Sequence, residues 1–226
     1  MSKTVLITGG NKGIGLELTR EFLALEYKVI VVARDFEGFE FSNSVECIEY
    51  DLTNVEGIPK LVSAMGQLDI LVNNAGVMYS LPYNDYPIDK VSSMLRLNLE
   101  APIKLIEECV KVGVTRVVNN ASVAAYTGHP DIWYGMTKAA LINATKSFAK
   151  IYEGKVILNA VAPSPIDTDM QKVNTEERKE AFRQSVITKR FGYADEVAKA
   201  MLWLATESPE YINGTTIDIN NGSYPR

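Results

Sequence analysis

Three residues in the middle of the chain, Ser122, Tyr134 and Lys138, carry side chains that can take part in proton transfer. Tyr134 and Lys138 are four positions apart in a segment of helical periodicity, so their side chains lie one above the other on a single helix face. An ammonium group beside a phenol favours the phenolate and lowers its pKa from about 10. A Tyr-x₃-Lys pair alone is usually a solvated helix face, and further motifs must support a catalytic interpretation.

A second motif is the glycine-rich segment from Thr8 to Gly15, TGGNKGIG, which joins an apolar segment to a helical one. Glycines permit a tight turn and a close approach of the backbone to a phosphate, and the helix that follows offers free N–H groups and a positive dipole end. Its spacing is Gly-x₃-Gly-x-Gly, which is neither G-x-G-x-x-G nor a P-loop. Its position before the first helix favours a dinucleotide site over a plain turn.

Short apolar segments alternate with helical ones along the whole chain. We predict strands at 3–8, 28–33, 45–50, 68–73, 115–120, 155–161 and 215–219, and helices at 16–25, 58–65, 88–112 (bent near Pro102), 133–152 and 195–206. This alternation predicts an α/β, doubly wound parallel sheet of about seven strands with helices on both faces. The polar segment 168–192 follows the sixth strand, where such sheets bind ligands, and we expect it to be a substrate lid.

Composition limits the class of protein. With 226 residues, 46% hydrophobic, the chain fits one domain with a sizeable core. Its 23 Lys+Arg and 28 Asp+Glu give a formal net charge of −5, which gives no reason to expect nucleic acid or an anionic membrane as partner. No segment is apolar enough for a membrane helix or signal peptide, so we expect a cytoplasmic protein. Cys47, Cys109 and the single His129 form no metal-ligand cluster, and we expect no metal.

These motifs, taken in order, resemble the classical short-chain dehydrogenase/reductase family over nearly the whole chain. The end of the chain is similar to bacterial 3-oxoacyl-reductase-like members, and carbonyl-reductase-like members are also similar. The elements that carry the resemblance are TGGNKGIG (8–15), Asp51-Leu52-Thr53, NNAG (73–76), Asn98, Ser122, Tyr134, Lys138, NAVAP (159–163) running to Thr168, and ING (212–214) followed by TTIDINNG. The resemblance implies a Rossmann fold, with residues 1–226 as a single dinucleotide-binding and catalytic domain.

The family resemblance also implies a mechanism of hydride transfer between a nicotinamide cofactor and a carbonyl or secondary alcohol. Tyr134 would be the general acid in reduction and the base in oxidation. Lys138 would lower its pKa and hold the nicotinamide ribose, and Ser122 would hydrogen-bond the carbonyl oxygen. Asn98 would steady a water that links Lys138 to solvent. These four residues are the expected catalytic set.

Cofactor contacts are likewise implied by the resemblance, at Gly9, Asn11, Lys12, Gly13, Ile14, Gly15, Arg34, Asp51, Leu52, Asn73, Ala75, Gly76, Tyr134, Lys138, Pro163, Ile166 and Thr168. Members that use NAD carry an acid at the last position of the second strand, where this chain has Ala33. Arg34 and Lys12 resemble the cations of NADP-dependent members, and they outweigh the single Asp35. We therefore predict a preference for NADP(H), with NAD(H) possible.

Two departures from the family pattern bear on the substrate pocket. Pro163-Ser164-Pro165 replaces the usual Pro-Gly, and the segment from Ser122 to Tyr134 is slightly short. His129 lies in that segment, where a surface position is favoured over a substrate contact. Met170 fits a pocket wall and lid packing equally well. The sequence does not name the substrate.

Three other interpretations remain. A regulator that binds the cofactor without catalysis would not need the Asn98, Ser122, Tyr134 and Lys138 set. An enoyl reductase of the same superfamily would space Tyr and Lys more widely, and a sugar-nucleotide epimerase would have a longer chain. The resemblance further implies a homotetramer, or a homodimer, that uses the 133–152 helix.

Overall fold

Seven parallel strands form one sheet in the order β3-β2-β1-β4-β5-β6-β7 in the computed structural model, which describes residues 2–225. The chain builds β1, β2 and β3 outward and then returns to place β4 beside β1, so the order reverses between β1 and β4. The predicted doubly wound sheet is confirmed. The strands are β1 (Thr4–Thr8), β2 (Lys28–Ala33), β3 (Glu46–Glu49), β4 (Ile70–Asn73), β5 (Arg116–Asn120), β6 (Ile157–Pro163) and β7 (Thr216–Ile219).

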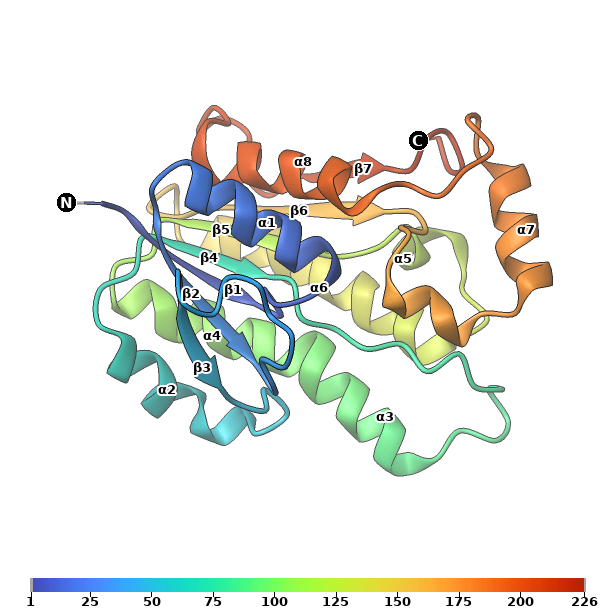
Figure 1. Cartoon of the computed structure of the whole chain (residues 1–226), viewed down its shortest axis with the longest axis horizontal. Coiled ribbons are helices and arrows are strands. Elements are labelled where there is room, and N and C mark those ends of the chain that lie inside the picture. Colours follow the sequence, from blue (N-terminus) through green and yellow to red (C-terminus); the bar gives the residue numbers. More distant parts are fainter. Residues whose placement is uncertain (1, 226) are drawn as a thin grey trace.

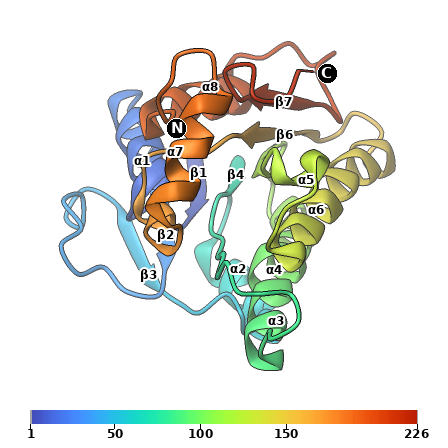
Figure 2. The same cartoon turned by 90° about the vertical axis from the view of Figure 1, so that its right-hand side faces the viewer.

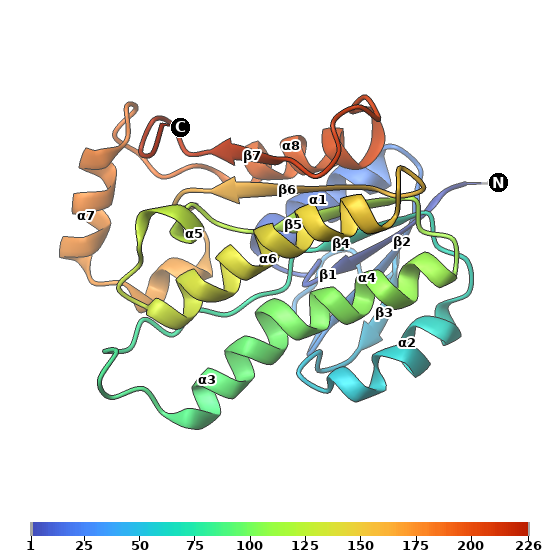
Figure 3. The same ribbon diagram turned by 180° about the vertical axis from the view of Figure 1, so that it is seen from behind.

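Helices cover both faces of the sheet. Helices α1 (Gly13–Ala24) and α8 (Ala194–Thr206) pack side by side on one face (Figure 1). On the opposite face lie α2 (Ile58–Met65), α4 (Ala101–Lys111) and α6 (Ile132–Ile151), which are seen from behind in Figure 3. The central strands are therefore covered on both sides, which accounts for their nearly continuous apolar sequences.

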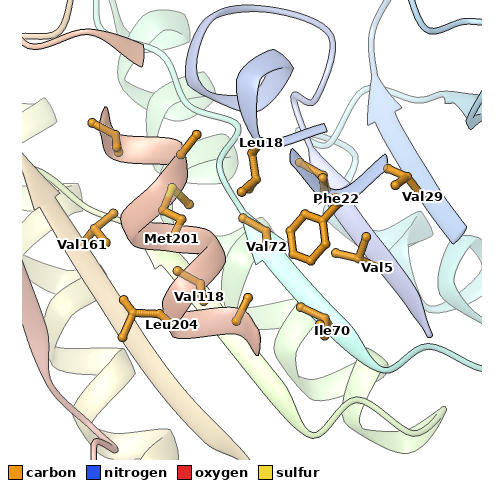
Figure 4. Packing of buried hydrophobic residues seen from close by; sticks show 14 of the residues in the cluster. Val5, Leu18, Phe22, Val29, Ile70, Val72, Val118, Val161, Met201 and Leu204 are labelled. Carbon is orange, nitrogen blue, oxygen red and sulfur yellow. The ribbon is translucent and has the colours of Figure 1, made fainter. Parts of the chain in front are cut away.

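Alternate residues of each strand contribute to two separate cores. Val5 points to the α1–α8 side, whereas the next residue, Leu6, packs on the α2–α4 side. In the first core, Leu18 and Phe22 of α1 meet Met201 of α8 over the strand valines (Figure 4). This two-residue alternation fixes the register of the strands and so fixes which residues emerge at their carboxyl ends.

The long helix predicted at 88–112 contains an irregular turn. It consists of α3 (Ile88–Leu95), a π-helical turn at Arg96–Glu100 and α4, which follows directly. Pro102 has no N–H to donate to the carbonyl of Asn98, four residues earlier, so regular α-helical bonding cannot continue there. The interruption thus lies just before the proline, and it contains Asn98.

The segment 168–192 lies beyond the carboxyl ends of the strands (Figure 1, Figure 2). It contains a 3₁₀ turn at Asp169–Val173 and the helix α7 (Glu176–Ser185), which begins where the Thr175 hydroxyl accepts from the Arg178 N–H. The sequence pattern missed α7 as well as the short α5 (Ala124–Thr127) and the 3₁₀ turn at Val55–Gly57. Within residues 2–225, no helix combines the length and apolar character needed to cross a bilayer.

Candidate active site

A cavity of about 350 Å³ opens at the carboxyl ends of the central strands. Its wall combines the glycine turn, the strand ends, the start of α6 and the 163–182 segment. Most of the predicted site residues line it: Gly9, Asn11, Lys12, Gly13, Ile14, Arg34, Asp51, Leu52, Ala75, Gly76, Ser122, Tyr134, Lys138, Pro163, Ile166 and Thr168. The topology therefore brings residues from most of the chain into one site.

Two predicted cofactor residues, Gly15 and Asn73, do not line this cavity. Gly15 lies inside α1, where an added Cβ would come 2.1 Å from the Gly9 carbonyl oxygen. Its absent side chain allows the helix to pack on the turn. Asn73 is buried at the carboxyl end of the central strand β4, where its amide donates to Asn119 Oδ1 at 2.8 Å. Both residues support the site from beneath.

Asn98 is also outside the cavity, and it is fully buried. Its Oδ1 accepts from the Val77 N–H at 2.8 Å, and its Nδ2 donates to the Val77 carbonyl at 2.8 Å and to Thr137 Oγ1 at 3.3 Å. The side chain thus ties the loop after β4 to α6. This geometry makes Asn98 a positioning residue in the structure, and the expected water relay stays a prediction.

Helix α6 places Tyr134 and Lys138 on one wall. The Asp131 carboxylate caps the helix by accepting from the Tyr134 N–H at 3.1 Å. The Lys138 ammonium lies 5.7 Å from the centre of the Tyr134 ring and donates to the Asn120 carbonyl at 2.7 Å. Ser122, just after β5, lines the same wall, close enough to the Tyr134 hydroxyl to influence its pKa. Three of the four predicted catalytic side chains are therefore adjacent.

Burial is the main cause of the pKa shifts of Lys138 and Tyr134. It lowers the pKa of Lys138 to about 8, because removal from water disfavours the ammonium form. Burial likewise raises the pKa of Tyr134, and the Ser122 hydrogen bond opposes the rise only in part. The lowering of the Tyr134 pKa expected from the Tyr-Lys spacing does not offset this effect of burial, and the part of Lys138 in it stays a prediction. Tyr134 is a protonated phenol at neutral pH and can therefore donate a proton.

The glycine turn fits a pyrophosphate. Gly9 and Gly13 have φ of 64° and 54°, the left-handed region that glycine enters without strain. No side chain caps the first turn of α1, so its N–H groups remain free at the cavity. A Cβ on Gly13 would come 3.3 Å from the Thr168 side chain, so the turn also lies against the segment after β6.

Asn74 and Asn120 line the cavity but were not among the predicted site residues, and they belong to a polar cluster beneath this turn. The Thr8 hydroxyl accepts from the N–H groups of Asn74 and Ala75 at 2.9 and 3.0 Å. Asn74 in turn accepts from Asn120 Nδ2 at 3.0 Å and lines the cavity. The signal was present as two Asn-Asn pairs at the ends of adjacent strands, where Asn73 and Asn119 are register partners. In each pair the first residue points into the core and the second faces the site.

The opposite end of the cavity contains His129, Met170 and Arg178. His129 is half-buried, with its ring 5.4 Å from that of Tyr134, so the expected surface position is wrong. Tyr126, in the same segment, stacks on Tyr224 and does not line the cavity. Arg178 was not predicted because it belongs to α7, whose sequence has no apolar face to reveal it.

At the far side of the glycine turn, Arg34 is exposed and forms no ion pair with residues 2–225. Lys12 pairs with Asp35 at 3.3 Å, and Asn11 donates to the Asp35 carbonyl at 2.9 Å. Asp35 therefore neutralises one of the two cations expected there, and Arg34 provides the unpaired positive charge.

A doubly wound parallel sheet with an uncapped glycine turn and a Ser-Tyr-Lys wall defines a nicotinamide-dinucleotide-dependent oxidoreductase. A family model described as enoyl-(acyl carrier protein) reductase matches residues 9–223. The 3-oxoacyl-[acyl-carrier-protein] reductase FabG of Aquifex aeolicus (strain VF5) is 32% identical over 98% of this chain and 97% of its own. The chain belongs to the short-chain dehydrogenase/reductase family, whose members use NAD(P) and act on small carbonyl or alcohol substrates.

Solved structures agree with this assignment. A short-chain dehydrogenase/reductase from Brucella melitensis superposes with a TM-score of 0.92 at 26% identity, covering 99% of this chain and 97% of that one. ElxO with NADP bound gives a TM-score of 0.86 at 31% identity, covering 99% of both chains. The expected Rossmann fold is thus confirmed.

Proposed function

We propose that the protein reduces a carbonyl, or oxidises the corresponding secondary alcohol, with Tyr134 as general acid and base and with a preference for NADP(H). The observation that carries the proposal is the contact of Ser122, Tyr134 and Lys138 on the wall of the cavity that begins at the glycine turn. A carbonyl oxygen near Ser122 and Tyr134 would receive the phenolic proton. The Tyr134 phenolate left by this transfer would then regain a proton from solvent by way of Lys138.

Different residues of this chain would bind the cofactor, stabilise the substrate oxygen and transfer the proton. The nicotinamide, when bound, supplies or accepts the hydride. The free N–H groups around Gly13 and Ile14 would hold the pyrophosphate, and Lys138 would donate to the ribose. Ser122 would stabilise the oxygen as negative charge develops on it. Asn98 would keep the Val77 loop and α6 in register, so that these groups remain aligned.

The NADP(H) preference is supported by Arg34, which remains unpaired at the end of β2. A guanidinium can bind a phosphate through two parallel hydrogen bonds, and a 2′-hydroxyl gives it much less. Two relatives of known structure, ElxO and a Burkholderia cenocepacia short-chain dehydrogenase, are described in complex with NADP.

Enoyl reduction is the second candidate, because the matching family model is described by that activity. The spacing of four between Tyr134 and Lys138 and the 3-oxoacyl reductase relatives favour carbonyl reduction. The two reactions differ in the bond that is reduced, and matched substrates separate them.

The test is a panel of ketones, 3-oxoacyl thioesters and enoyl thioesters, followed by cofactor absorbance with the wild type and Tyr134→Phe. We expect turnover of carbonyl compounds and a loss of at least about 10²-fold in kcat for the variant, since only the transferable proton is removed. NADPH affinity should stay within about twofold, because the ring is retained. Tyr211→Phe, at a fully exposed position, is the control.

Three outcomes would contradict the proposal. Turnover of enoyl substrates alone would support the second candidate. Tight NADPH binding with no turnover of any panel member would support a regulator. Near-normal turnover by Tyr134→Phe would remove Tyr134 from the mechanism.

A further inference from the structure

Arg178 is a cation in the substrate end of the cavity without a carboxylate partner. It projects from α7, is half-buried, and lines the cavity with Met170 and Phe182. Its guanidinium contacts His129 Nε2 at 2.8 Å and Ser80 Oγ at 3.5 Å. None of the ion pairs formed by residues 2–225 includes it, unlike Lys179 and Arg183 on the same helix. A positive charge is therefore held next to the reaction site and left uncompensated.

Asp131 is the acid that acts on Arg178, but both of its carboxylate oxygens already accept hydrogen bonds from other groups. Its Oδ1 accepts from the Tyr134 N–H at 3.1 Å. Its Oδ2 accepts from the Ser80 N–H and from the Tyr86 hydroxyl, both at 2.9 Å. Asp131 thus caps α6 and holds the Ser80 loop, and it acts on Arg178 only at a distance.

His129 does not compensate the charge either. An arginine N–H can only donate, so His129 Nε2 accepts and the ring proton is on Nδ1, 3.2 Å from the Asp131 carbonyl. The alternative, with Nδ1 accepting from the Asp131 N–H, would set two donors 2.8 Å apart at Nε2. Burial, together with the charge of Arg178, lowers the pKa of His129. The imidazole is therefore neutral at neutral pH and serves to aim the guanidinium.

Arg178 lies near Tyr134, the proposed proton donor, through its contact with His129. The His129 ring is 5.4 Å from the Tyr134 ring, so one imidazole lies close to both the guanidinium and the proton donor. A half-buried guanidinium is costly without an anion, and carboxylates and phosphates bind its planar fork in two parallel hydrogen bonds. The glycine turn and Arg34, which fit the phosphates of the cofactor, belong to the other part of the cavity wall.

We propose that the physiological substrate is an anionic carbonyl compound, whose carboxylate or phosphate pairs with Arg178 while its carbonyl faces Ser122 and Tyr134. This proposal rests on the proposed function, since it names the substrate class of the same site. His129 is a positioning residue in it, because it acts through the guanidinium that it contacts.

The experiment compares charged and uncharged forms of the same carbonyl compound. One set consists of 3-oxobutanoate, 4-oxopentanoate and 5-oxohexanoate, each beside its methyl ester. A second set consists of 3-oxobutanoyl-coenzyme A beside its N-acetylcysteamine thioester, which lacks phosphates. The wild type should prefer a charged member, and the set that shows the preference identifies carboxylate or phosphate as the anion.

Arg178→Gln should reduce kcat/KM for the preferred anion by about tenfold or more, mainly through KM, because a charge-assisted pair is lost. Turnover of the uncharged partner should change by less than about twofold. Arg178→Lys keeps the charge but not the planar fork of the guanidinium, so its kcat/KM for the anion should lie between those of the wild type and Arg178→Gln. Arg183→Gln is the matched control, since Arg183 is on the same helix, pairs with Glu180 and does not line the cavity.

Equal losses on charged and uncharged members, or a loss of NADPH affinity in Arg178→Gln, would overturn the anion proposal and leave the proposed function intact. If no carbonyl compound is turned over, the proposed function fails. Binding of pentanoate and pentanamide to the NADPH complex, measured by calorimetry, then decides the anion site separately. Binding of pentanoate that is lost in Arg178→Gln supports it, and equal binding of the two compounds contradicts it.

Discussion

Arg34 and Asp35 are neighbours of opposite charge with different roles. Asp35 supports the glycine turn, whereas Arg34 is available to bind the cofactor. The Asp35 backbone carbonyl and side chain both contact the glycine turn, through Asn11 and Lys12. Asp35 is therefore drawn toward the turn, and Lys12 loses part of its value as a phosphate ligand. Arg34 has no such partner among the described residues and is the residue that should distinguish NADP(H) from NAD(H).

We therefore expect Arg34→Ala to weaken NADPH binding by about tenfold or more and to leave NADH binding within about twofold, since only the 2′-phosphate contact is lost. Lys12→Ala should have a smaller effect because its charge is shared with Asp35. Titrations of both cofactors at equal ionic strength measure this. Tighter binding of NADH than of NADPH by the wild type would contradict the prediction.

Burial of Lys138 should make the free energy of unfolding depend on pH. Its pKa is lowered to about 8 from its ordinary value of 10.5, so between these values the unfolded chain binds more protons than the folded one. The stability contributed at this position therefore rises with pH across that window. Burial of the ammonium form costs the folded protein stability at neutral pH, and that cost is relieved as pH rises.

Without cofactor, the difference in free energy of unfolding between Lys138→Met and the wild type should therefore shrink as pH rises from 8 toward 10.5. The change should be on the order of 3 kcal/mol across the full window. Urea denaturation of both proteins over this range measures it, and groups that titrate in both proteins cancel. A difference that is constant with pH would show that Lys138 has an ordinary pKa.

At the scale of elements, the sequence was most informative where burial imposes a period. The continuous apolar segment Val5-Leu6-Ile7 identified β1, and similar segments identified the other central strands; in the structure their residues alternate between two cores. Helix α7 was not predicted because none of its residues is buried, so nothing imposes an apolar period on its sequence. That Asn73 lies outside the cavity has a related reason. Neighbouring asparagines at a strand end face opposite sides, and the sequence alone does not say which one reaches the cavity.

The start of α1 depends on the packing of Gly15 on Gly9, since a Cβ at Gly15 would lie 2.1 Å from a backbone oxygen that has little freedom to move. We expect Gly15→Ala to lower the free energy of unfolding by about 1–3 kcal/mol, as overpacking does, and to weaken NADPH binding through the displaced turn. Ser63→Ala, at an exposed position in α2, should change stability by less than about 0.5 kcal/mol. Unchanged stability and affinity in Gly15→Ala would show that the turn adapts freely.

At the scale of the whole molecule, α6 joins the candidate active site to an uncovered surface. Tyr134 and Lys138 are on its buried side, whereas Ile132, Met136 and Ile151 are exposed by 42%, 55% and 65% on the same helix. Ile132 and Met136 lie one turn apart and form an apolar stripe at the start of the helix, and Ile151 is the last residue of α6. An apolar stripe of this kind is typical of an interface between subunits.

We therefore predict a homotetramer, or a homodimer, that buries this stripe against the α6 of a second copy. Light scattering coupled to size exclusion should give a mass at least twice that of one chain. Met136→Glu should reduce the mass, because a carboxylate would be buried without a partner. It should also lower activity if the interface supports the α6 wall. Tyr83→Glu, at another exposed apolar position outside α6, should leave the mass unchanged. A wild-type protein that remains monomeric at high concentration would show that the stripe stays exposed to water and that the α6 wall needs no second copy.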